Sequence, residues 1–253
     1  MWNDKKVVVI FAAYNEEMNI KGAIEEFQAV STIGISQVVD EIVVVDNNSD
    51  DRTAALAEEA GATVISEKKQ GYGHALQRGL RFAQGDLIVL CEPDGTFVPK
   101  DLLKLLAYSE DFEMVCGTRT YPGLIWRDAN MRWFLRLGNY FVAKFLEILY
   151  FTPSLSDCGC TFRLIHRKAA DKIRPDLFVG QSHFLPNMVI AARANGVRFI
   201  EVPINYRGRI GVSKITGTLG GVWKTGLAMV WLIITLWPKF VWTRFAEHRP
   251  PAD

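Results

Sequence analysis

Apolar runs of strand length alternate with segments of helical periodicity through the first half of the chain. The runs expected to form strands are Val7–Ala13, Glu41–Asp46, Ala62–Ser66, Asp86–Cys91 and Phe112–Gly117. The segments with helical periodicity are Glu16–Val30, Asp51–Ala60, Tyr72–Ala83 and Pro99–Tyr108. This alternation is typical of βαβ units, so we expect an α/β fold whose mainly parallel sheet is flanked by helices.

Two later segments are apolar in a different way. Leu124–Phe151 is rich in aromatic residues yet contains several cations, among which Arg132 and Arg136 would share one helix face. We expect one or two amphipathic helices there, either packed in the core or lying in a membrane interface. The apolar run Thr225–Trp237 is thirteen residues long, which is short for a helix that crosses a bilayer and needs about twenty residues.

The C-terminal run has two interpretations. Extended back to Leu219, it becomes long enough for one span, but Lys239, Arg244 and Arg249 would then face away from a cytosolic catalytic domain, against the positive-inside tendency. We therefore expect an interfacial or re-entrant segment, with a single span as the alternative. The expected organisation is a catalytic domain at 1–217, with interface helices at 124–151, and a membrane-associated segment at 218–253.

Composition narrows the class of protein. A chain of 253 residues with 49% hydrophobic residues can bury a full core. Its 29 basic and 28 acidic residues give a formal net charge of +1, so no global charge favours a nucleic-acid partner. The four cysteines have no zinc-site spacing and are expected to be reduced thiols in the cytosol. The run Val7–Ala13 ends abruptly in polar residues, so we expect no signal peptide.

Polar residues follow three of the predicted strands, as Tyr14-Asn15-Glu16, Asp46-Asn47-Asn48-Ser49-Asp50 and Glu92-Pro93-Asp94. Ligands of open parallel sheets bind beyond the carboxyl ends of the strands. Glu92 and Asp94 are two residues apart at a strand end, so their side chains face the same way and can hold a hard divalent cation, which suits a diphosphate. An isolated acidic pair more often caps the next helix or lies in a turn, but Asp46 at the end of a second apolar strand favours a site.

These three groups, together with Gly71-Tyr72-Gly73-His74-Ala75 and Gly117-Thr118-Arg119, resemble in order an inverting GT-A glycosyltransferase of family 2. Asp157-Cys158-Gly159-Cys160-Thr161-Phe162-Arg163 resembles the Asp-x-x-Ser-Gly-Phe-Arg element of polyprenyl-phosphate glycosyltransferases, the group that includes dolichyl-phosphate mannose synthase. The segment from Asn205 to Lys214 resembles their Arg-x-Gly-x-Ser-Lys element. The chain departs from the pattern at Glu92, where Asp is commoner, at Asn47, which replaces an Asp, and at Cys160-Thr161, which replace Ser-Gly.

The resemblance implies roles for particular residues. Glu92 and Asp94 are expected to bind Mg²⁺ or Mn²⁺. The candidates for nucleotide binding are Ala12, Tyr14, Glu16, Asp46, Asn48, Gly71, Gly73 and Asp94. The catalytic candidates are Asp94, Arg119, Arg132 and Asp157. The candidates for the acceptor phosphate are Arg136, Arg209, Ser213 and Lys214.

The implied reaction moves one sugar from a UDP- or GDP-sugar to undecaprenyl or dolichyl phosphate at the cytoplasmic face of a membrane, with inversion. A phosphate monoester has a second pKa of about 6, so this acceptor is already an oxyanion at neutral pH and needs little general-base help. Asp157 is then expected to orient the acceptor or an arginine. The expected partners are the nucleotide sugar, the lipid acceptor and a membrane, with a membrane-spanning partner or a second copy of the chain as further possibilities.

Three other functions remain open from the residues alone. A hydroxyl acceptor on a lipid or glycan would require a positioned general base. A sugar-phosphate nucleotidyltransferase would need a glycine-rich triphosphate loop after the first strand, where Tyr14-Asn15-Glu16-Glu17 stands instead and would repel a triphosphate. A non-catalytic membrane scaffold would retain its function after loss of Asp94.

Overall fold

A computed structural model describes residues 1–129, 133–210 and 219–247. In this part of the chain, seven strands form one sheet in the order β3-β2-β1-β4-β6-β5-β7. The strands are β1 (Val7–Ala13), β2 (Glu41–Asp46), β3 (Thr63–Ser66), β4 (Leu87–Cys91), β5 (Met114–Thr118), β6 (Arg163–His166) and β7 (Phe199–Pro203). Every neighbouring pair is parallel except the two pairs that include β6, which is antiparallel to β4 and β5. The predicted α/β fold with a mainly parallel sheet is therefore confirmed.

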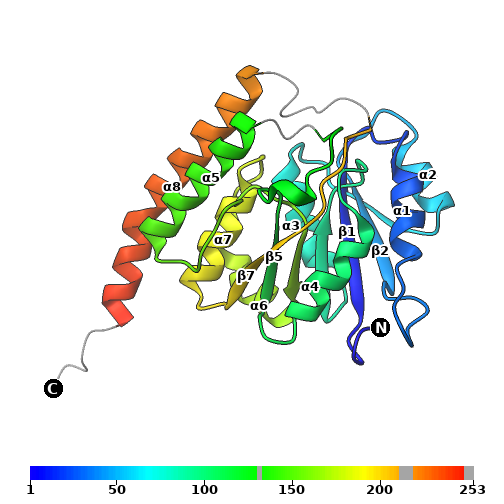
Figure 1. The fold of residues 1–253 in the computed structure, drawn as a ribbon, viewed down its shortest axis with the longest axis horizontal. Helices are drawn as coiled ribbons and strands as arrows, with labels where there is room; N and C mark the ends of the chain where they lie inside the picture. The colour runs from blue at the N-terminus through cyan, green and yellow to red at the C-terminus, as the bar shows by residue number, and fades with distance from the viewer. Residues whose placement is uncertain (130–132, 211–218, 248–253) are drawn as a thin grey trace.

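Helices cover both faces of the sheet (Figure 1). The α-helices are α1 (Ile20–Gln28), α2 (Thr53–Glu59), α3 (Tyr72–Phe82), α4 (Leu102–Tyr108), α5 (Trp133–Tyr150), α6 (Arg167–Ile173), α7 (Phe184–Ala194) and α8 (Leu219–Glu247), and the short 3₁₀ turns are η1 (Pro99–Asp101), η2 (Pro122–Leu124) and η3 (Arg174–Asp176). α1, α2 and α4 pack on one face of the sheet, whereas α3, α6 and α7 pack on the other, with α5 and α8 outside them.

The central strands are apolar throughout because both of their faces are covered. In β1, Val8 and Ile10 point into the core beneath α3 and α7, and Val9 and Phe11 point into the core beneath α1 and α4. A strand buried on both faces has a continuous apolar sequence instead of an alternating one. This pattern is what made the central strands predictable.

The predicted boundaries of β1 and β2 agree with the structure, and those of β3, β4 and β5 differ by one or two residues. The first helix was expected to begin at Glu16 but begins at Ile20. The reason is a turn in which the Glu16 amide donates to Thr53 Oγ1 at 2.8 Å and Asn19 Nδ2 donates to the Glu16 carboxylate at 2.7 Å. β6 and β7 were not predicted from the sequence, because both strands are short and carry charged residues.

One helix, α5, occupies most of the segment predicted to hold one or two amphipathic helices. It buries Ala143, Leu146 and Tyr150 in the core and turns Trp133, Phe141 and other large apolar side chains outward. One face of α5 thus packs in the core and the other is exposed; the membrane-interface position of this segment stays a prediction.

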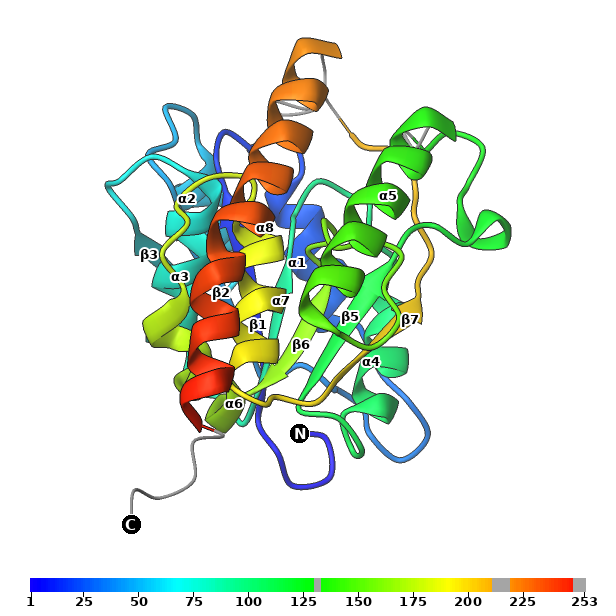
Figure 2. The same ribbon diagram turned by 90° about the vertical axis from the view of Figure 1, so that its left-hand side faces the viewer.

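α8 lies along the flank of the domain beside α5 and over α7 (Figure 2). Tyr150 Oη donates to the Ile233 carbonyl at 2.8 Å, and Trp237 Nε1 donates to the Leu149 carbonyl at 3.1 Å. Ile233 and Phe240 are buried in the same core as α5 and α7. Among the described residues, Gly220–Val241 is the one helical stretch long and apolar enough to cross a membrane. The domain boundary at residue 218 stays a prediction, because one face of α8 shares the core of the preceding domain.

Candidate functional site

The carboxyl ends of six parallel strands meet at one edge of the sheet, and the polar segments predicted to form a site follow them. Tyr14-Asn15-Glu16 follows β1, Asp46 ends β2 and is followed by Asn47-Asn48, and Arg119 follows β5. Because β6 is antiparallel, the loop that begins it at Asp157 reaches the same edge. The predicted groups of polar residues therefore come together.

A cluster of three carboxylates surrounds the guanidinium of Arg209. Arg209 Nη1 lies 2.5 Å from Asp94 Oδ2 and 4.0 Å from Glu92 Oε2, and Arg209 Nη2 lies 2.6 Å from Glu16 Oε1. β4 ends at Cys91, so Glu92 and Asp94 belong to the turn beyond the strand and not to the strand itself. Asp94 Oδ1 accepts hydrogen bonds from the Thr96 amide and hydroxyl at 3.0 and 2.6 Å, which directs Oδ2 toward Arg209.

The carboxylate cluster has the chemistry of a site for a divalent cation and a diphosphate. Its oxygens are hard donors, as Mg²⁺ and Mn²⁺ prefer. The described residues contain no preformed group of three metal-ligating side chains, so a cation held by Glu92 and Asp94 would complete its coordination with substrate oxygens and water. Arg209 Nε is buried and has no hydrogen-bond partner among the described residues. A phosphate oxygen would satisfy this donor.

Glu92 is held by two hydroxyl groups. Tyr72 Oη donates to Glu92 Oε1 at 3.0 Å, Thr161 Oγ1 donates to the same oxygen at 2.5 Å, and the two hydroxyls also contact each other. Burial and the nearby charge of Asp94 raise the pKa of Glu92, and the hydrogen bonds from Thr161 and Tyr72 oppose that rise. A bound cation would favour the ionised form of this carboxylate.

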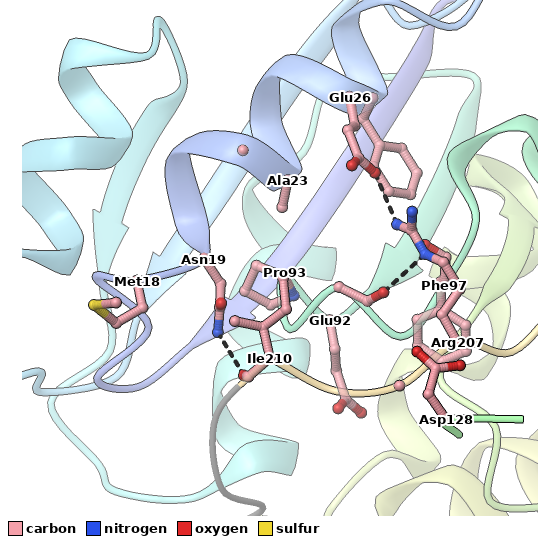
Figure 3. A pocket seen from close by; sticks show the side chains of 14 residues that line it. Met18, Asn19, Ala23, Glu26, Glu92, Pro93, Phe97, Asp128, Arg207 and Ile210 are labelled. Atoms are coloured by element: carbon pink, nitrogen blue, oxygen red, sulfur yellow. Dashed lines mark hydrogen bonds and ion pairs between the residues drawn. The ribbon is translucent and has the colours of Figure 1, made fainter. Parts of the chain in front are cut away.

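The segment that carries Arg209 is attached firmly to the turn after β4 (Figure 3). Arg207 donates to the carbonyls of Gly95 and Phe97, both at 3.0 Å, and pairs with Glu26 of α1 at 2.8 Å. Asn19 Nδ2 donates to the Ile210 carbonyl at 3.1 Å. These contacts line a pocket of about 290 Å³ between α1 and the turn, with Glu92 in its wall. They hold Arg209 over Asp94.

A second charged group lies between β5 and the loop before β6. Asp157 is fully buried and accepts from Arg119 Nε at 2.7 Å, from Arg119 Nη2 at 3.0 Å and from the Gly159 amide at 3.1 Å. The Arg119 guanidinium also lies over the ring of Tyr206, 5.3 Å from its centroid. Burial alone would raise the pKa of Asp157, but the charge and hydrogen bonds of Arg119 lower the pKa below its ordinary value. Asp157 therefore orients Arg119 and stays ionised.

The loop before β6 is rigid because buried groups hold its backbone. The fully buried Arg163 donates to the carbonyls of Cys158, Cys160 and Leu185 at 2.6 to 2.9 Å. Glu201 of β7 accepts from the amides of Ser156 and Asp157, at 2.7 and 2.8 Å. Asp157 and Thr161 are thus carried by a loop whose polar backbone groups are largely paired.

The polar segments after β1 and β2, which carry several predicted nucleotide-binding residues, contact each other. Asn15 N donates to Ser49 Oγ at 3.0 Å and Asp50 N donates to Asn15 Oδ1 at 2.8 Å, while Ala12 pairs with a β2 residue in the sheet. Tyr14 and Asp46 are half-buried at the same edge. Asn48 Nδ2 donates to the Lys68 carbonyl at 2.7 Å.

Asn47 has a structural role that explains why an amide replaces a carboxylate there. Its Nδ2 donates to the carbonyls of Glu67 and Lys69 at 2.8 and 2.9 Å, and its Oδ1 accepts from the Gly71 amide at 2.8 Å. An aspartate at this position could accept the last of these bonds but could donate neither of the others.

The close backbone approach expected at Gly71 and Gly73 is made by the protein itself. A Cβ atom at Gly71 would clash with the carbonyl oxygen of Gly180, and one at Gly73 would clash with that of Val179. Packing against the segment before α7 is therefore sufficient to require glycine at both positions. Their contact with a nucleotide stays a prediction.

Other predicted residues lie elsewhere. Arg136 is half-buried in the first turn of α5 and takes no part in the contacts described above. Arg132, Ser213 and Lys214 lie outside the described residues. The sequence interpretation missed the supporting roles of Tyr72, Thr96, Thr161, Tyr206 and Arg207. Thr161 carried a signal because it stands where the family pattern has glycine, and Tyr72, Tyr206 and Arg207 stand within segments that resemble the family but were given no role of their own.

Removing Asp157 should destabilise the protein strongly, because it leaves Arg119 as a mostly buried, unpaired charge. Loss of one partner of a buried ion pair costs about 3–5 kcal/mol, and denaturant unfolding of Asp157→Ala should show a decrease of this order. Adding Arg119→Met should recover part of the loss. Breaking the exposed Arg52–Glu59 pair by Glu59→Ala is the control, with an expected change below about 1 kcal/mol. An equally small change for Asp157→Ala would contradict the role assigned to the pair.

Comparisons with known proteins agree with the geometry. The chain is 31% identical over 209 residues to the low-salt glycan biosynthesis hexosyltransferase Agl6 of Haloferax volcanii, covering 82% of this chain but only 49% of Agl6. It is 29% identical over 216 residues to a dolichyl-phosphate hexose transferase of the same organism, covering 85% of this chain and 89% of the relative. The chain thus spans about half the length of the first relative and most of the second.

Solved structures show the same fold. Glucosyl-3-phosphoglycerate synthase from Mycobacterium tuberculosis, in complex with Mn²⁺, UDP-glucose and phosphoglyceric acid, superposes with a TM-score of 0.68 at 18% identity, covering 93% of this chain and 80% of that one. The sequence model of the family described as "Glycosyl transferase family 2" matches residues 8–174, which is more than half of the chain. The chain therefore belongs to glycosyl transferase family 2 and has a GT-A-like fold.

Proposed function

We propose that the protein transfers a single hexose from a nucleoside-diphosphate sugar to a polyprenyl phosphate at the cytoplasmic face of a membrane, with inversion at the anomeric carbon. The relative named dolichyl-phosphate hexose transferase, most of whose length aligns with this chain, supports this acceptor. The observation that carries the proposal is the cluster of Glu16, Glu92 and Asp94 around the Arg209 guanidinium.

The carboxylate cluster is the donor side of the proposed site. A Mg²⁺ or Mn²⁺ ion held by Glu92 and Asp94 would neutralise the diphosphate and stabilise its charge as it leaves. The structural neighbour has been solved in complex with Mn²⁺ and UDP-glucose, which supports a divalent cation and a nucleotide sugar as the bound molecules. Tyr14, Glu16 and Asp46 lie at the ends of β1 and β2, where the base and ribose of the nucleotide are expected.

In this proposal Arg209 binds the donor diphosphate and not the acceptor phosphate. The sequence pattern grouped it with the acceptor phosphate, but its ion pairs with Glu16 and Asp94 favour the diphosphate of the donor. A guanidinium presents several N–H groups in a planar fork that matches phosphate oxygens. Arg209 Nε, which has no partner among the described residues, is available for such a contact.

In the part of the chain that the structure describes, the contacts of Asp157 favour an acceptor that is already an anion. Asp157 accepts its hydrogen bonds from Arg119 and nearby amides, so it is poorly placed to take a proton from a hydroxyl group. A phosphate oxygen of the acceptor needs no deprotonation. It forms a bond to the anomeric carbon while the bond from that carbon to the diphosphate oxygen breaks, and the bonding electrons leave with the diphosphate. Arg119, oriented by Asp157, supplies positive charge for the acceptor phosphate.

The outer helices supply the proposed membrane contact. α5 and α8 lie side by side (Figures 1 and 2), and each packs one face against the domain. Their outward face carries large exposed apolar side chains, namely Trp133, Phe141 and Ile148 of α5 and Trp223, Leu227 and Trp231 of α8. Aromatic and aliphatic side chains in this arrangement are typical of helices in a membrane interface. The packing of α8 along the domain favours an interfacial position over an independent span.

Labelled UDP- and GDP-sugars, offered with undecaprenyl or dolichyl phosphate to membranes that contain the protein, test the proposal. We expect label to enter the lipid-extractable fraction with at least one donor and to require a divalent cation. Asp94→Asn should reduce the rate by about 100-fold or more. It removes a proposed ligand of the cation that stabilises the negative charge of the transition state. Glu59→Gln, on the exposed side of α2, is the matched control and should be unaffected. Label found only in a hydroxyl product, or in none, would contradict the lipid-phosphate acceptor.

Replacing Arg209 separates the donor and acceptor sides. Arg209→Ala should raise KM for the nucleotide sugar by about 10-fold or more, which corresponds to one charge-assisted hydrogen bond, and should leave KM for the lipid phosphate within about 2-fold. Steady-state kinetics with each substrate varied in turn measures both constants. A rise confined to the lipid phosphate would return Arg209 to the acceptor side.

A further inference from the structure

Glu92 stands out in the carboxylate cluster because its two oxygens have different surroundings. Oε1 accepts hydrogen bonds from Tyr72 and Thr161, which come from the start of α3 and the loop before β6. Oε2 lies 4.0 Å from Arg209 Nη1, which also pairs with Asp94. Oε1 thus accepts hydrogen bonds from two hydroxyl groups, while Oε2 lies near the guanidinium that pairs with Asp94.

Thr161 and Glu92 are two positions where the chain departs from the family pattern, and they contact each other. Glutamate is one methylene longer than aspartate and has one more rotatable bond, so more conformational freedom must be lost to hold its carboxylate in place. Glycine, which the pattern has at position 161, could not supply a hydroxyl. The Thr161 hydroxyl donates to Glu92 Oε1 at 2.5 Å, a contact that glycine could not make.

The support for the two hydroxyls is itself rigid. Thr161 is buried and sits on the loop held by Arg163, whose guanidinium donates to the Cys160 carbonyl. Tyr72 follows Gly71, whose amide donates to Asn47 Oδ1 at 2.8 Å, and precedes Gly73, which packs against the Val179 carbonyl. Two separate elements of the fold therefore hold Glu92 Oε1, and through it they fix the position of the whole carboxylate.

We propose that Thr161 and Tyr72 are positioning residues that hold Glu92 Oε1, so that Oε2 is presented to the divalent cation, and that Thr161 compensates for glutamate at position 92. This inference rests on the proposed function, because it takes the cation site as given. In this proposal both hydroxyls act through Glu92.

Mn²⁺ binding in the presence of UDP or GDP, followed by electron paramagnetic resonance, tests the inference without measuring turnover. Thr161→Val removes the hydroxyl with little change in shape and should weaken Mn²⁺ binding by about 10-fold or more, the loss expected for one hydrogen bond to a charged group. Thr161→Ser keeps the hydroxyl and should stay within about 2-fold of the parent protein. Tyr72→Phe should weaken binding similarly, and it tests the same oxygen from a different element if Thr161→Val folds poorly.

A double-mutant cycle tests the compensation directly. Glu92→Asp shortens the side chain and should weaken Mn²⁺ binding in the parent protein, but by a smaller factor in the Thr161→Val background, where no hydroxyl remains to be lost. Equal factors in the two backgrounds would show that the residues act independently and would overturn the compensation.

The remaining outcomes separate this inference from the proposed function. Normal Mn²⁺ binding by both Thr161→Val and Tyr72→Phe, together with loss of binding by Asp94→Asn, would overturn the positioning roles and leave the cation site intact. Failure of the parent protein to bind Mn²⁺ with either nucleotide would overturn both proposals. Circular dichroism of each variant confirms that the fold is retained.

Discussion

The concentration of negative charge at the carboxyl edge of the sheet is the constraint on which the rest of the site depends. Glu16 and Asp94 are among the buried polar residues, and Glu92 shares their crevice. Carboxylates so close together repel one another and require a counter-charge, because a buried charge without a partner costs several kcal/mol. Arg209 provides that counter-charge in the structure. Arg207 and Asn19, which attach its segment to the turn after β4 and to α1, keep it in place.

The second charged group, Asp157 and Arg119, differs from the cluster in which several carboxylates share one arginine. At Asp157 and Arg119 a single carboxylate serves to orient an arginine, and Tyr206 supports the other side of the guanidinium. The edge of the sheet is therefore divided into one region that attracts cations and one that presents a cation. A transfer from a diphosphate to a phosphate needs both, since the leaving group and the nucleophile are each negatively charged.

Much of the fold could be predicted because the central strands are apolar on both faces and their carboxyl ends carry the polar residues. Glu92 and Asp94 were found from their spacing, although the strand on which that spacing was argued ends at Cys91. β6 was not predicted, because it is only four residues long and begins with Arg163, so it lacks the apolar run by which the central strands were found. The burial of that arginine depends on three carbonyls brought together by the tertiary structure.

The supporting contacts were beyond the reach of the sequence for a similar reason. Thr161 and Glu92 are 69 residues apart, and Arg209 and Glu16 are 193 apart. No local periodicity links such pairs. The packing of α8 on α5 and α7 likewise depends on which face of an almost uniformly apolar helix finds a partner, and hydrophobicity alone does not specify that face.

The coupling between protein-bound Mn²⁺ and the phosphorus nuclei of UDP or GDP tests the central claim most directly. Pulsed electron paramagnetic resonance detects this coupling when a phosphate oxygen is a ligand of the ion. We expect ³¹P coupling in the parent protein and loss of the protein-bound signal in Asp94→Asn. Protein-bound Mn²⁺ that shows no ³¹P coupling and persists in Asp94→Asn would contradict a cation site built on the turn after β4.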